Sequence, residues 1–267
     1  MITDKRPIGV FDSGLGGLTV VKALKNLLPN ESILYFGDTA RLPYGVKSKD
    51  LVIQYSNQIA GFLIKKNAKM IIIACNTATA MALKELENNF KDIPIIGVIG
   101  PSSIQASLES INKNIGVIGT IATIKSNAYE SALKSIDKNI NVFSKDCPLF
   151  VPFVEEGMVE GEAINLIVEH YLSSFRNDID TMILGCTHYP LLEPVIKKYV
   201  SDIKLVDSAS AVAKYANNIL NDCKIKNGYN KEGSLECFVT DLPRQFEKLG
   251  RIFLGETIKE PQLVNEF

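Results

Sequence analysis

The sequence MIIIACNTATA, residues 70–80, carries an apolar run directly into a cysteine and a polar turn. A second stretch, MILGCTHYP at residues 182–190, repeats this order and places Cys186 after its own apolar run. Short continuous apolar runs bounded by turn residues are typical of strands buried on both faces in a parallel sheet. Because open parallel sheets bind ligands beyond the carboxyl ends of their strands, Cys75 and Cys186 are both predicted at a binding edge.

Apolar runs alternate with amphipathic segments along the whole chain. The apolar runs predict strands at Ile8–Phe11, Ser32–Phe36, Met70–Ala74, Ile95–Ile99, Ile115–Ile118, Met182–Leu184, Lys204–Val206 and Leu235–Val239. The amphipathic segments predict helices at Leu18–Leu27, Lys49–Lys65, Ala78–Asn88, Ser126–Ser135, Gly161–Ser173, Leu192–Tyr199, Ser210–Leu220 and Leu242–Leu249. Polar residues 137–141 and 224–233 are predicted to be loops. The alternation predicts an α/β fold with parallel sheets covered by helices on both faces.

Two segments indicate an internal duplication. PIGVFDSGLGGLTVVKAL at 7–24 and NIGVIGTIATIKSNAY at 114–129 both run from a strand through a glycine turn into a helix. Each precedes a cysteine turn by a similar distance, with 66 residues from Gly9 to Cys75 and 70 from Gly116 to Cys186. Short strand-helix openings also resemble one another by chance, so spacing alone leaves both readings open. If the duplication holds, two related α/β units face each other across a cleft.

The composition excludes several classes of partner. The chain has 267 residues, of which 46% are hydrophobic and 22% charged, with a net charge of −1, so no general attraction to nucleic acid or anionic membranes is expected. No apolar run approaches the roughly 20 residues of a membrane span. The N-terminal segment lacks the apolar core of a signal peptide, which predicts a cytoplasmic protein.

The cysteines are odd in number and form no CxxC pair, so a disulfide framework is not expected. With only two histidines in the chain, no metal site is predicted. Cys147, Cys223 and Cys237 are predicted to be small buried hydrophobes. Cys75 and Cys186 differ because each precedes a predicted helix, whose positive end should lower the pKa of the thiol.

Two further turns are candidates for ligand binding. In FDSGLGG, residues 11–17, the glycines let the backbone approach a ligand, and the amides that follow could receive a carboxylate or phosphate. Neither the dinucleotide spacing nor a P-loop lysine is present. In DTARLPYGVKS, residues 38–48, Tyr44 and Gly45 could close over a small ligand, although an ordinary surface loop fits equally well.

A matched pair of thiols suits inversion of a stereocentre. One thiolate removes a proton from one face of a carbon, and the opposite thiol delivers a proton to the other face. His188 could assist one thiol and Asp12 could orient the other. Two other readings stay open, namely a thiol hydrolase that uses Cys186 with His188 and leaves Cys75 idle, and a small-anion binding module with inert cysteines.

Six motifs in register strengthen the first reading: VFDSGLGGLTV, GDTARLPYG, ACNTATA, GTIATIKSNAY, PLFVPFVEEG and GCTHYPLL. Together they resemble the cofactor-independent aspartate/glutamate racemases, and among them bacterial glutamate racemase, over roughly residues 7–210. The resemblance implies interconversion of L- and D-glutamate, without cofactor or metal, supplying D-glutamate for peptidoglycan synthesis. It favours a homodimer, and a racemase of aspartate or another acidic amino acid is the close alternative.

The resemblance also implies two similar parallel-sheet α/β domains, 1–98 plus 210–267 and 99–209, with the active site in the cleft between them. It places catalytic roles on Cys75, Cys186, Asp12, Glu155 and His188. Spacing alone indicates that Glu155 is a solvated acid, and only the motif favours it over Glu156. The implied substrate contacts are Asp12, Ser13, Tyr44, Gly45, Asn76, Thr77, Thr120, Thr123, Thr187 and His188.

Overall fold

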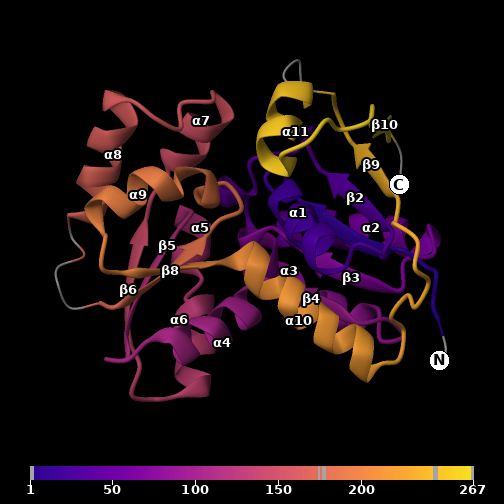
Figure 1. Ribbon diagram of the computed structural model, residues 1–267, viewed down its shortest axis with the longest axis horizontal. Helices are drawn as coiled ribbons and strands as arrows, with labels where there is room; N and C mark the ends of the chain where they lie inside the picture. Colours follow the sequence, from indigo (N-terminus) through magenta and orange to yellow (C-terminus); the bar gives the residue numbers. More distant parts are fainter. Residues whose placement is uncertain (1–2, 174, 176–178, 243–245, 266–267) are drawn as a thin grey trace.

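Two parallel sheets organise the chain in a computed structural model that describes residues 3–173, 175, 179–242 and 246–265 (Figure 1). The larger sheet has the order β10-β9-β2-β1-β3-β4 and the smaller one β6-β5-β7-β8, and all their pairings are parallel. The strands are β1 Ile8–Asp12, β2 Ile33–Gly37, β3 Met70–Ile73, β4 Ile95–Gly97, β5 Asn114–Gly119, β6 Asn141–Asp146, β7 Thr181–Gly185, β8 Lys204–Asp207, β9 Leu235–Val239 and β10 Gln262–Leu263.

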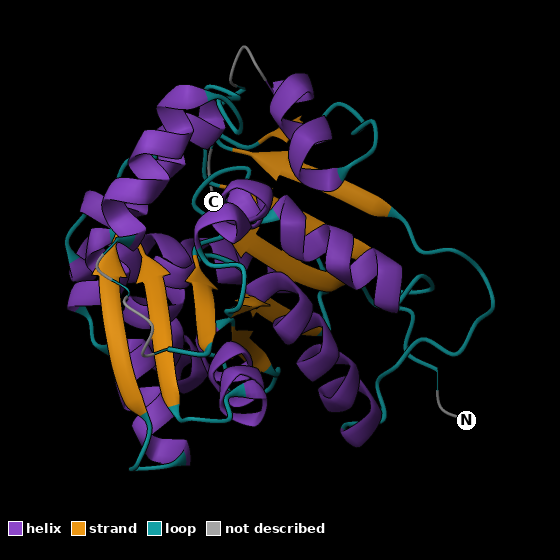
Figure 2. Ribbon diagram, turned by 60° about the vertical axis from the view of Figure 1, so that its left-hand side comes forward, coloured by secondary structure: helices purple, strands orange, loops and turns teal. Residues whose placement is uncertain are grey.

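Helices cover the faces of both sheets (Figure 2). The α-helices are α1 Leu18–Leu27, α2 Lys49–Lys65, α3 Asn76–Asn89, α4 Ile99–Glu109, α5 Ile121–Lys125, α6 Ala128–Ile136, α7 Phe150–Glu155, α8 Glu162–Leu172, α9 Glu193–Tyr199, α10 Ser208–Asp222 and α11 Phe246–Leu254. Two short 3-10 helices are η1 Tyr44–Val46 and η2 Tyr189–Leu192. Every residue of β1, β2, β3 and β7 is buried, which explains why their sequences read as continuous apolar runs.

The two sheets share one strand order, so the predicted fold of two similar parallel-sheet units is confirmed. In the first sheet the order β2-β1-β3-β4 repeats as β6-β5-β7-β8 in the second. The two cysteines follow equivalent strands, because Cys75 comes after β3 and Cys186 after β7. The strands β9 and β10 extend only the first sheet.

Several local predictions were wrong or incomplete. The predicted strand Ile95–Ile99 ends at Gly97, and helix α4, which sequence patterns missed, begins at Ile99. Pro101 lies in the first turn of α4, where its missing amide hydrogen costs nothing. The predicted loop 137–141 runs into β6, and α5, α7 and β10 were also missed. The loop predicted at 224–233 is confirmed.

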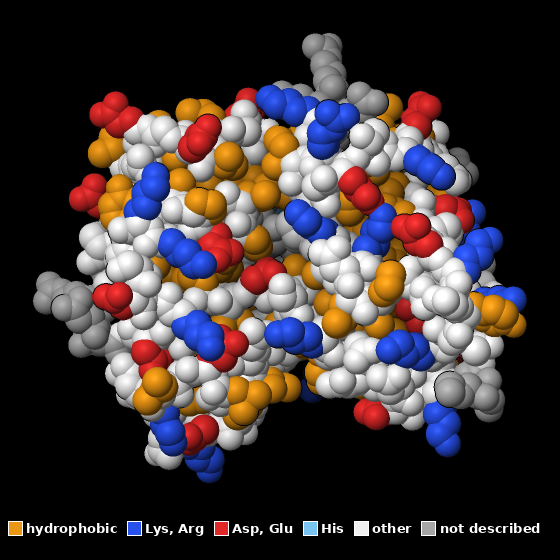
Figure 3. Space-filling view, viewed as in Figure 1, with side chains coloured by type: hydrophobic (Ala, Val, Ile, Leu, Met, Phe, Trp, Pro, Cys, Tyr) orange, Lys and Arg blue, Asp and Glu red, His pale blue; other side chains and the backbone are white. Residues whose placement is uncertain are grey.

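The predicted helix Leu242–Leu249 overlaps residues 243–245, which lie outside the described part of the chain, and α11 is described from Phe246 to Leu254. Cys147 and Cys237 are buried as expected, but Cys223 is exposed because it caps the end of α10 at the surface. Among the described residues, no helix combines the length and hydrophobicity of a membrane span. Basic and acidic side chains are interspersed on the face shown in Figure 3.

A buried ion pair links the segment after α10 to the first sheet through Asn227. Lys69, which precedes β3, places its Nζ 2.6 Å from Glu31, and the two side chains are 0% and 2% exposed. The same Nζ donates to the Asp4 carbonyl at 2.8 Å. Glu31 in turn accepts a hydrogen bond from the amide of Asn227 at 2.7 Å. Buried charges of this kind are stable only while both partners are present.

We therefore expect Lys69→Met to lower the free energy of unfolding by about 3–5 kcal/mol, because it leaves the Glu31 carboxylate buried without its cation. Urea unfolding measures the loss. The control Lys65→Met, at an exposed lysine, should change it by less than about 0.5 kcal/mol. The double variant Lys69→Met/Glu31→Gln should recover part of the loss, and equal stability of Lys69→Met and wild type would contradict this account.

Candidate active site

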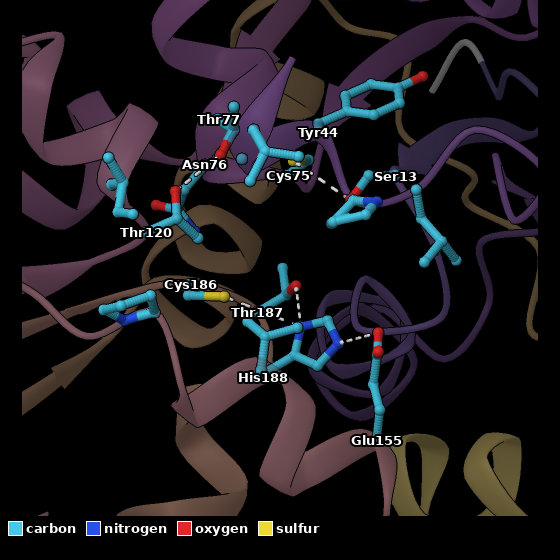
Figure 4. Close-up of a pocket in the computed structure, with 18 of the residues that line it drawn as sticks. Ser13, Tyr44, Cys75, Asn76, Thr77, Thr120, Glu155, Cys186, Thr187 and His188 are labelled. Atoms are coloured by element: carbon cyan, nitrogen blue, oxygen red, sulfur yellow. Dashed lines mark hydrogen bonds and ion pairs between the residues drawn. The ribbon is translucent and has the colours of Figure 1, made fainter.

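A cavity of about 250 Å³ lies between the two sheets and is lined by both Cys75 and Cys186. It is smaller than the roughly 300–1,000 Å³ typical of pockets for drug-sized ligands, so it suits a small molecule. Figure 4 shows Cys75 and Ser13 on one side of the space and Cys186, Thr187 and His188 on the opposite side. The walls therefore come from both halves of the molecule, the first built on the sheet of β1–β4, β9 and β10 and the second on the sheet of β5–β8.

Cys75 is held at the N-terminus of α3. Its backbone is extended and its sulfur accepts the amide of Ala78 at 3.4 Å, so the thiol caps the helix. The thiol also donates to Ser13 Oγ at 3.7 Å. Burial, followed by the negative charge of Asp12, raises the pKa of the Cys75 thiol to about 12. The prediction that the helix dipole lowers the pKa of Cys75 was wrong, because removal of the thiol from water has the larger effect.

Asp12 ends β1 and lies behind the cavity wall, with only 1% of its surface exposed. One carboxylate oxygen accepts the Gly14 amide at 3.2 Å, and the other has no hydrogen-bond partner. Burial raises the pKa of Asp12, outweighing the opposite effects of His188 and of the amides in the turn. The carboxyl is therefore a group that can take up a proton near Cys75.

The glycine turn after β1 reaches the cysteine turn of the second sheet. A Cβ on Gly16 would lie 2.4 Å from Thr187 Oγ1 and 2.6 Å from the His188 ring. Thr19 Oγ1 donates to the Gly16 carbonyl at 2.8 Å and lies 3.4 Å from the Thr187 carbonyl. Glycine is thus required here for close approach between the two halves of the chain.

Cys186 follows β7 and is paired with a histidine. Its sulfur lies 3.8 Å from His188 Nδ1, and His188 Nε2 lies 3.3 Å from Glu155 Oε1. Burial alone would lower the pKa of His188, but hydrogen bonds to Cys186 and Glu155 outweigh it and raise the pKa to about 10. The imidazole is therefore cationic at neutral pH, and its positive charge lies beside the Cys186 sulfur.

Three threonine hydroxyls meet at the side of the cavity. Thr77, in the first turn of α3, lies 3.0 Å from Thr120 Oγ1 and 3.2 Å from Thr123 Oγ1. The last two hydroxyls are 2.9 Å apart. Thr77 lies in the helix after β3 of the first sheet, whereas Thr120 follows β5 of the second sheet and caps α5. The cluster therefore joins the two halves of the molecule. It supplies hydroxyl groups that can donate to a ligand carboxylate.

The loop after β2 forms a packed wall of the cavity. Tyr44 is 1% exposed and its hydroxyl donates to Asp38, which also pairs with Arg41 at 2.8 Å. A Cβ on Gly45 would lie 3.2 Å from the Cβ of Thr120. The loop therefore forms part of the cavity wall, and its closure over a ligand stays a prediction.

Most of the predicted residues gather around one space. Those that line the cavity are Ser13, Tyr44, Gly45, Cys75, Asn76, Thr77, Thr120, Glu155, Cys186, Thr187 and His188. Asp12 and Thr123 lie behind the lining and act on it through neighbouring groups. Glu155 has 36% of its side chain exposed but also contacts His188, which spacing could not indicate.

The lining also contains residues that sequence patterns did not single out. They are Leu42, Pro43, Val46, Ile121, Pro148, Val151 and Pro152, whereas Gly14, which also lines the cavity, belongs to the predicted glycine turn. Most are apolar, and apolar loop residues carry no chemical signal, although several lie inside the quoted motifs. Among the residues that the structure describes, no three His, Cys, Asp or Glu side chains are grouped so that they could hold a metal ion.

Comparison with known proteins shows the family. The model of the Asp/Glu/Hydantoin racemase family matches residues 8–216. The chain belongs to this family. The resemblance indicated by the six motifs is therefore confirmed, and the class of enzyme is an amino-acid racemase, an isomerase.

Close relatives match almost the whole chain. A glutamate racemase of Aquifex aeolicus is 48% identical over 97% of this chain and 98% of its own length. The crystal structure of glutamate racemase from Francisella tularensis in complex with D-glutamate has a TM-score of 0.92, 43% identity and 98% coverage of both chains. The racemase isoform RacE1 of Bacillus anthracis has a TM-score of 0.93, 38% identity and 97% coverage of both.

The raised pKa of His188 predicts how stability depends on pH. A group whose pKa rises from 6.5 to about 10 on folding stabilises the fold fully below pH 6.5 and loses this contribution as pH rises through about 10. We expect the difference in unfolding free energy between wild type and His188→Gln to shrink steadily across that window. Urea unfolding at several pH values measures it, and a difference independent of pH would contradict the assignment.

Proposed function

We propose that this chain interconverts L- and D-glutamate by proton transfer at Cα, with Cys75 and Cys186 as the two acid-base groups. The observation that carries the proposal is the placement of the two thiols on opposite sides of one small cavity. Similarity to named glutamate racemases over nearly the whole chain supports glutamate as the substrate. A racemase needs this geometry because the proton must leave one face of Cα and return to the other.

The two thiols have different neighbours in the cavity. The pKa of about 12 keeps Cys75 a neutral proton donor, whereas the cationic His188 lies 3.8 Å from the Cys186 sulfur and can stabilise negative charge on it during proton transfer. With L-glutamate bound, Cys186 takes the Cα proton and Cys75 delivers its own proton to the opposite face, which yields D-glutamate. For the reverse reaction the protons are first exchanged: Cys75 loses its proton to Asp12, whose pKa is raised by burial, and Cys186 receives a proton from the His188 imidazolium.

Substrate binding rests on donors at the rim. The amides at the N-terminus of α3, with Ser13, Asn76 and the threonine hydroxyls, are suited to the two carboxylates of glutamate. Fixed donors that line the cavity also stabilise the negative charge that develops as Cα loses its proton. None of the described residues that line the cavity is a lysine, the residue that forms a Schiff base with pyridoxal-type cofactors.

The wider setting follows from the product. We propose that D-glutamate made in the cytoplasm supplies peptidoglycan synthesis and that the active species is a homodimer. We also propose a division into domains at 1–98 plus 210–267 and 99–209. The sheets support it, because β1–β4, β9 and β10 form one sheet and β5–β8 the other.

Incubation with each enantiomer of glutamate in D₂O, without added cofactor, tests the reaction. Circular dichroism should decay to zero, and NMR should find deuterium at Cα of the product. D-Aspartate should turn over with a kcat/KM at least about tenfold lower, as expected for a substrate one methylene shorter. Binding of glutamate without exchange of its Cα hydrogen would favour an anion-binding module, and faster turnover of aspartate would reassign the substrate.

Cys75→Ala and Cys186→Ala should each lower kcat for racemisation by about 10²–10⁴-fold or more, because each removes one acid-base group. The dissociation constant of D-glutamate should change little in calorimetry. Cys147→Ala is the matched control, since this cysteine is buried outside the cavity lining, and it should retain turnover. A wild-type rate of racemisation in Cys186→Ala would contradict this mechanism.

A further inference from the structure

A tyrosine outside the cavity makes a short hydrogen bond to an amide that lines it. The hydroxyl of Tyr129, on α6, donates to Asn76 Oδ1 at 2.6 Å. Both side chains are 2% exposed. Asn76 is the first residue of α3 and follows Cys75 directly, so this amide lies next to one of the two thiols. The bond joins α3, which follows a strand of the first sheet, to α6, which follows a strand of the second.

The bond decides which end of the amide remains available. Burial raises the pKa of the Tyr129 hydroxyl above its ordinary value, against the opposing effects of Ser102 and Ser208, so the hydroxyl stays protonated and can donate. An asparagine side chain has one accepting oxygen and one donating NH₂ group. With Oδ1 bonded to Tyr129, the NH₂ group is left over, and Asn76 Nδ2 is buried without a hydrogen-bond partner.

An unpaired buried donor is costly, and the cost is removed when a ligand accepts its hydrogen bond. Asn76 lines the cavity in which the glutamate carboxylates would bind. If the amide were turned over, its oxygen would face a carboxylate and repel it. Recognition of an anionic substrate at this position therefore requires the orientation that the tyrosine hydroxyl holds in place.

The tyrosine hydroxyl is itself held firmly. Helix α6 packs against α4, and α4 packs against α3 and α10. Ser102, in the first turn of α4, donates to the Val98 carbonyl at 2.6 Å, and Ser208, which begins α10, donates to the Leu184 carbonyl at 2.7 Å. Both lie close enough to the Tyr129 hydroxyl to affect its pKa. These two helices begin where the chain passes from one sheet to the other. The hydroxyl thus has a fixed position at the junction of the two halves.

We propose that Tyr129 is a positioning residue that locks the Asn76 amide with Nδ2 turned toward a carboxylate of the bound substrate. This inference rests on the proposed function. It predicts an effect on substrate binding that is transmitted only through Asn76. A purely structural bond between the two halves would instead lower stability without a specific effect on KM.

Tyr129→Phe removes the donor and leaves the ring. We expect KM for both enantiomers of glutamate to rise about tenfold, the order expected for weakening one hydrogen bond to a charged group, while kcat changes less than about threefold. In an Asn76→Ala background the same substitution should cause no further rise in KM. Tyr189→Phe is the matched control, since it removes a buried tyrosine hydroxyl that donates to the Cys147 carbonyl at 3.0 Å, and its KM should stay near the wild-type value.

An unchanged KM in Tyr129→Phe, or an equal rise in both backgrounds, would overturn the inference. Asn76→Asp gives a second test that keeps the partner of Tyr129, since an aspartate oxygen can accept the same bond. It presents an acceptor to the substrate carboxylate, so KM should rise more than in Tyr129→Phe, and an unchanged KM would contradict the orientation. If the wild-type protein does not racemise glutamate, the proposed function fails, whereas an active wild type with an unaffected Tyr129→Phe refutes only the role of Tyr129.

Discussion

The carboxyl ends of two parallel sheets face each other, and the cavity between Cys75 and Cys186 exists because of that arrangement. In the first sheet, Ser13 follows β1 and Cys75 follows β3, and in the second, Thr120 follows β5 and Cys186 follows β7. All four side chains line the same space. A repeated strand order therefore places chemically similar groups on opposite walls, which is the symmetry that a reaction with mirror-image substrates needs.

The environments of the two thiols break this symmetry. Cys75 is surrounded by buried groups and an acid, which keep its proton bound, whereas Cys186 lies beside an imidazole made cationic by Glu155 and the sulfur itself. Different surroundings of two like residues are a common basis for assigning acid and base roles. Here the difference arises from burial and the nearby Asp12 charge at Cys75 and from His188 beside Cys186.

Sequence patterns could predict the parts of the structure that depend on burial along one strand. The apolar runs before Cys75 and Cys186 are continuous because β3 and β7 are buried on both faces. Strand β6 was missed because it lies at a sheet edge and its polar residues are largely exposed. The prediction of a lowered pKa for Cys75 was also wrong. A helix dipole can be inferred from local sequence, whereas the burial that raises this pKa comes from distant segments. The Tyr129–Asn76 bond crosses between the two halves, so no spacing along the chain indicates it.

The most direct test of the central claim is a crystal structure of the protein with D-glutamate bound. The account predicts that Cα lies between the two sulfur atoms, with Cys75 Sγ and Cys186 Sγ on opposite faces and each at about 3.5 Å, the separation of reacting atoms before transfer. A glutamate bound outside this cavity, or with both sulfur atoms on the same side of Cα, would contradict it.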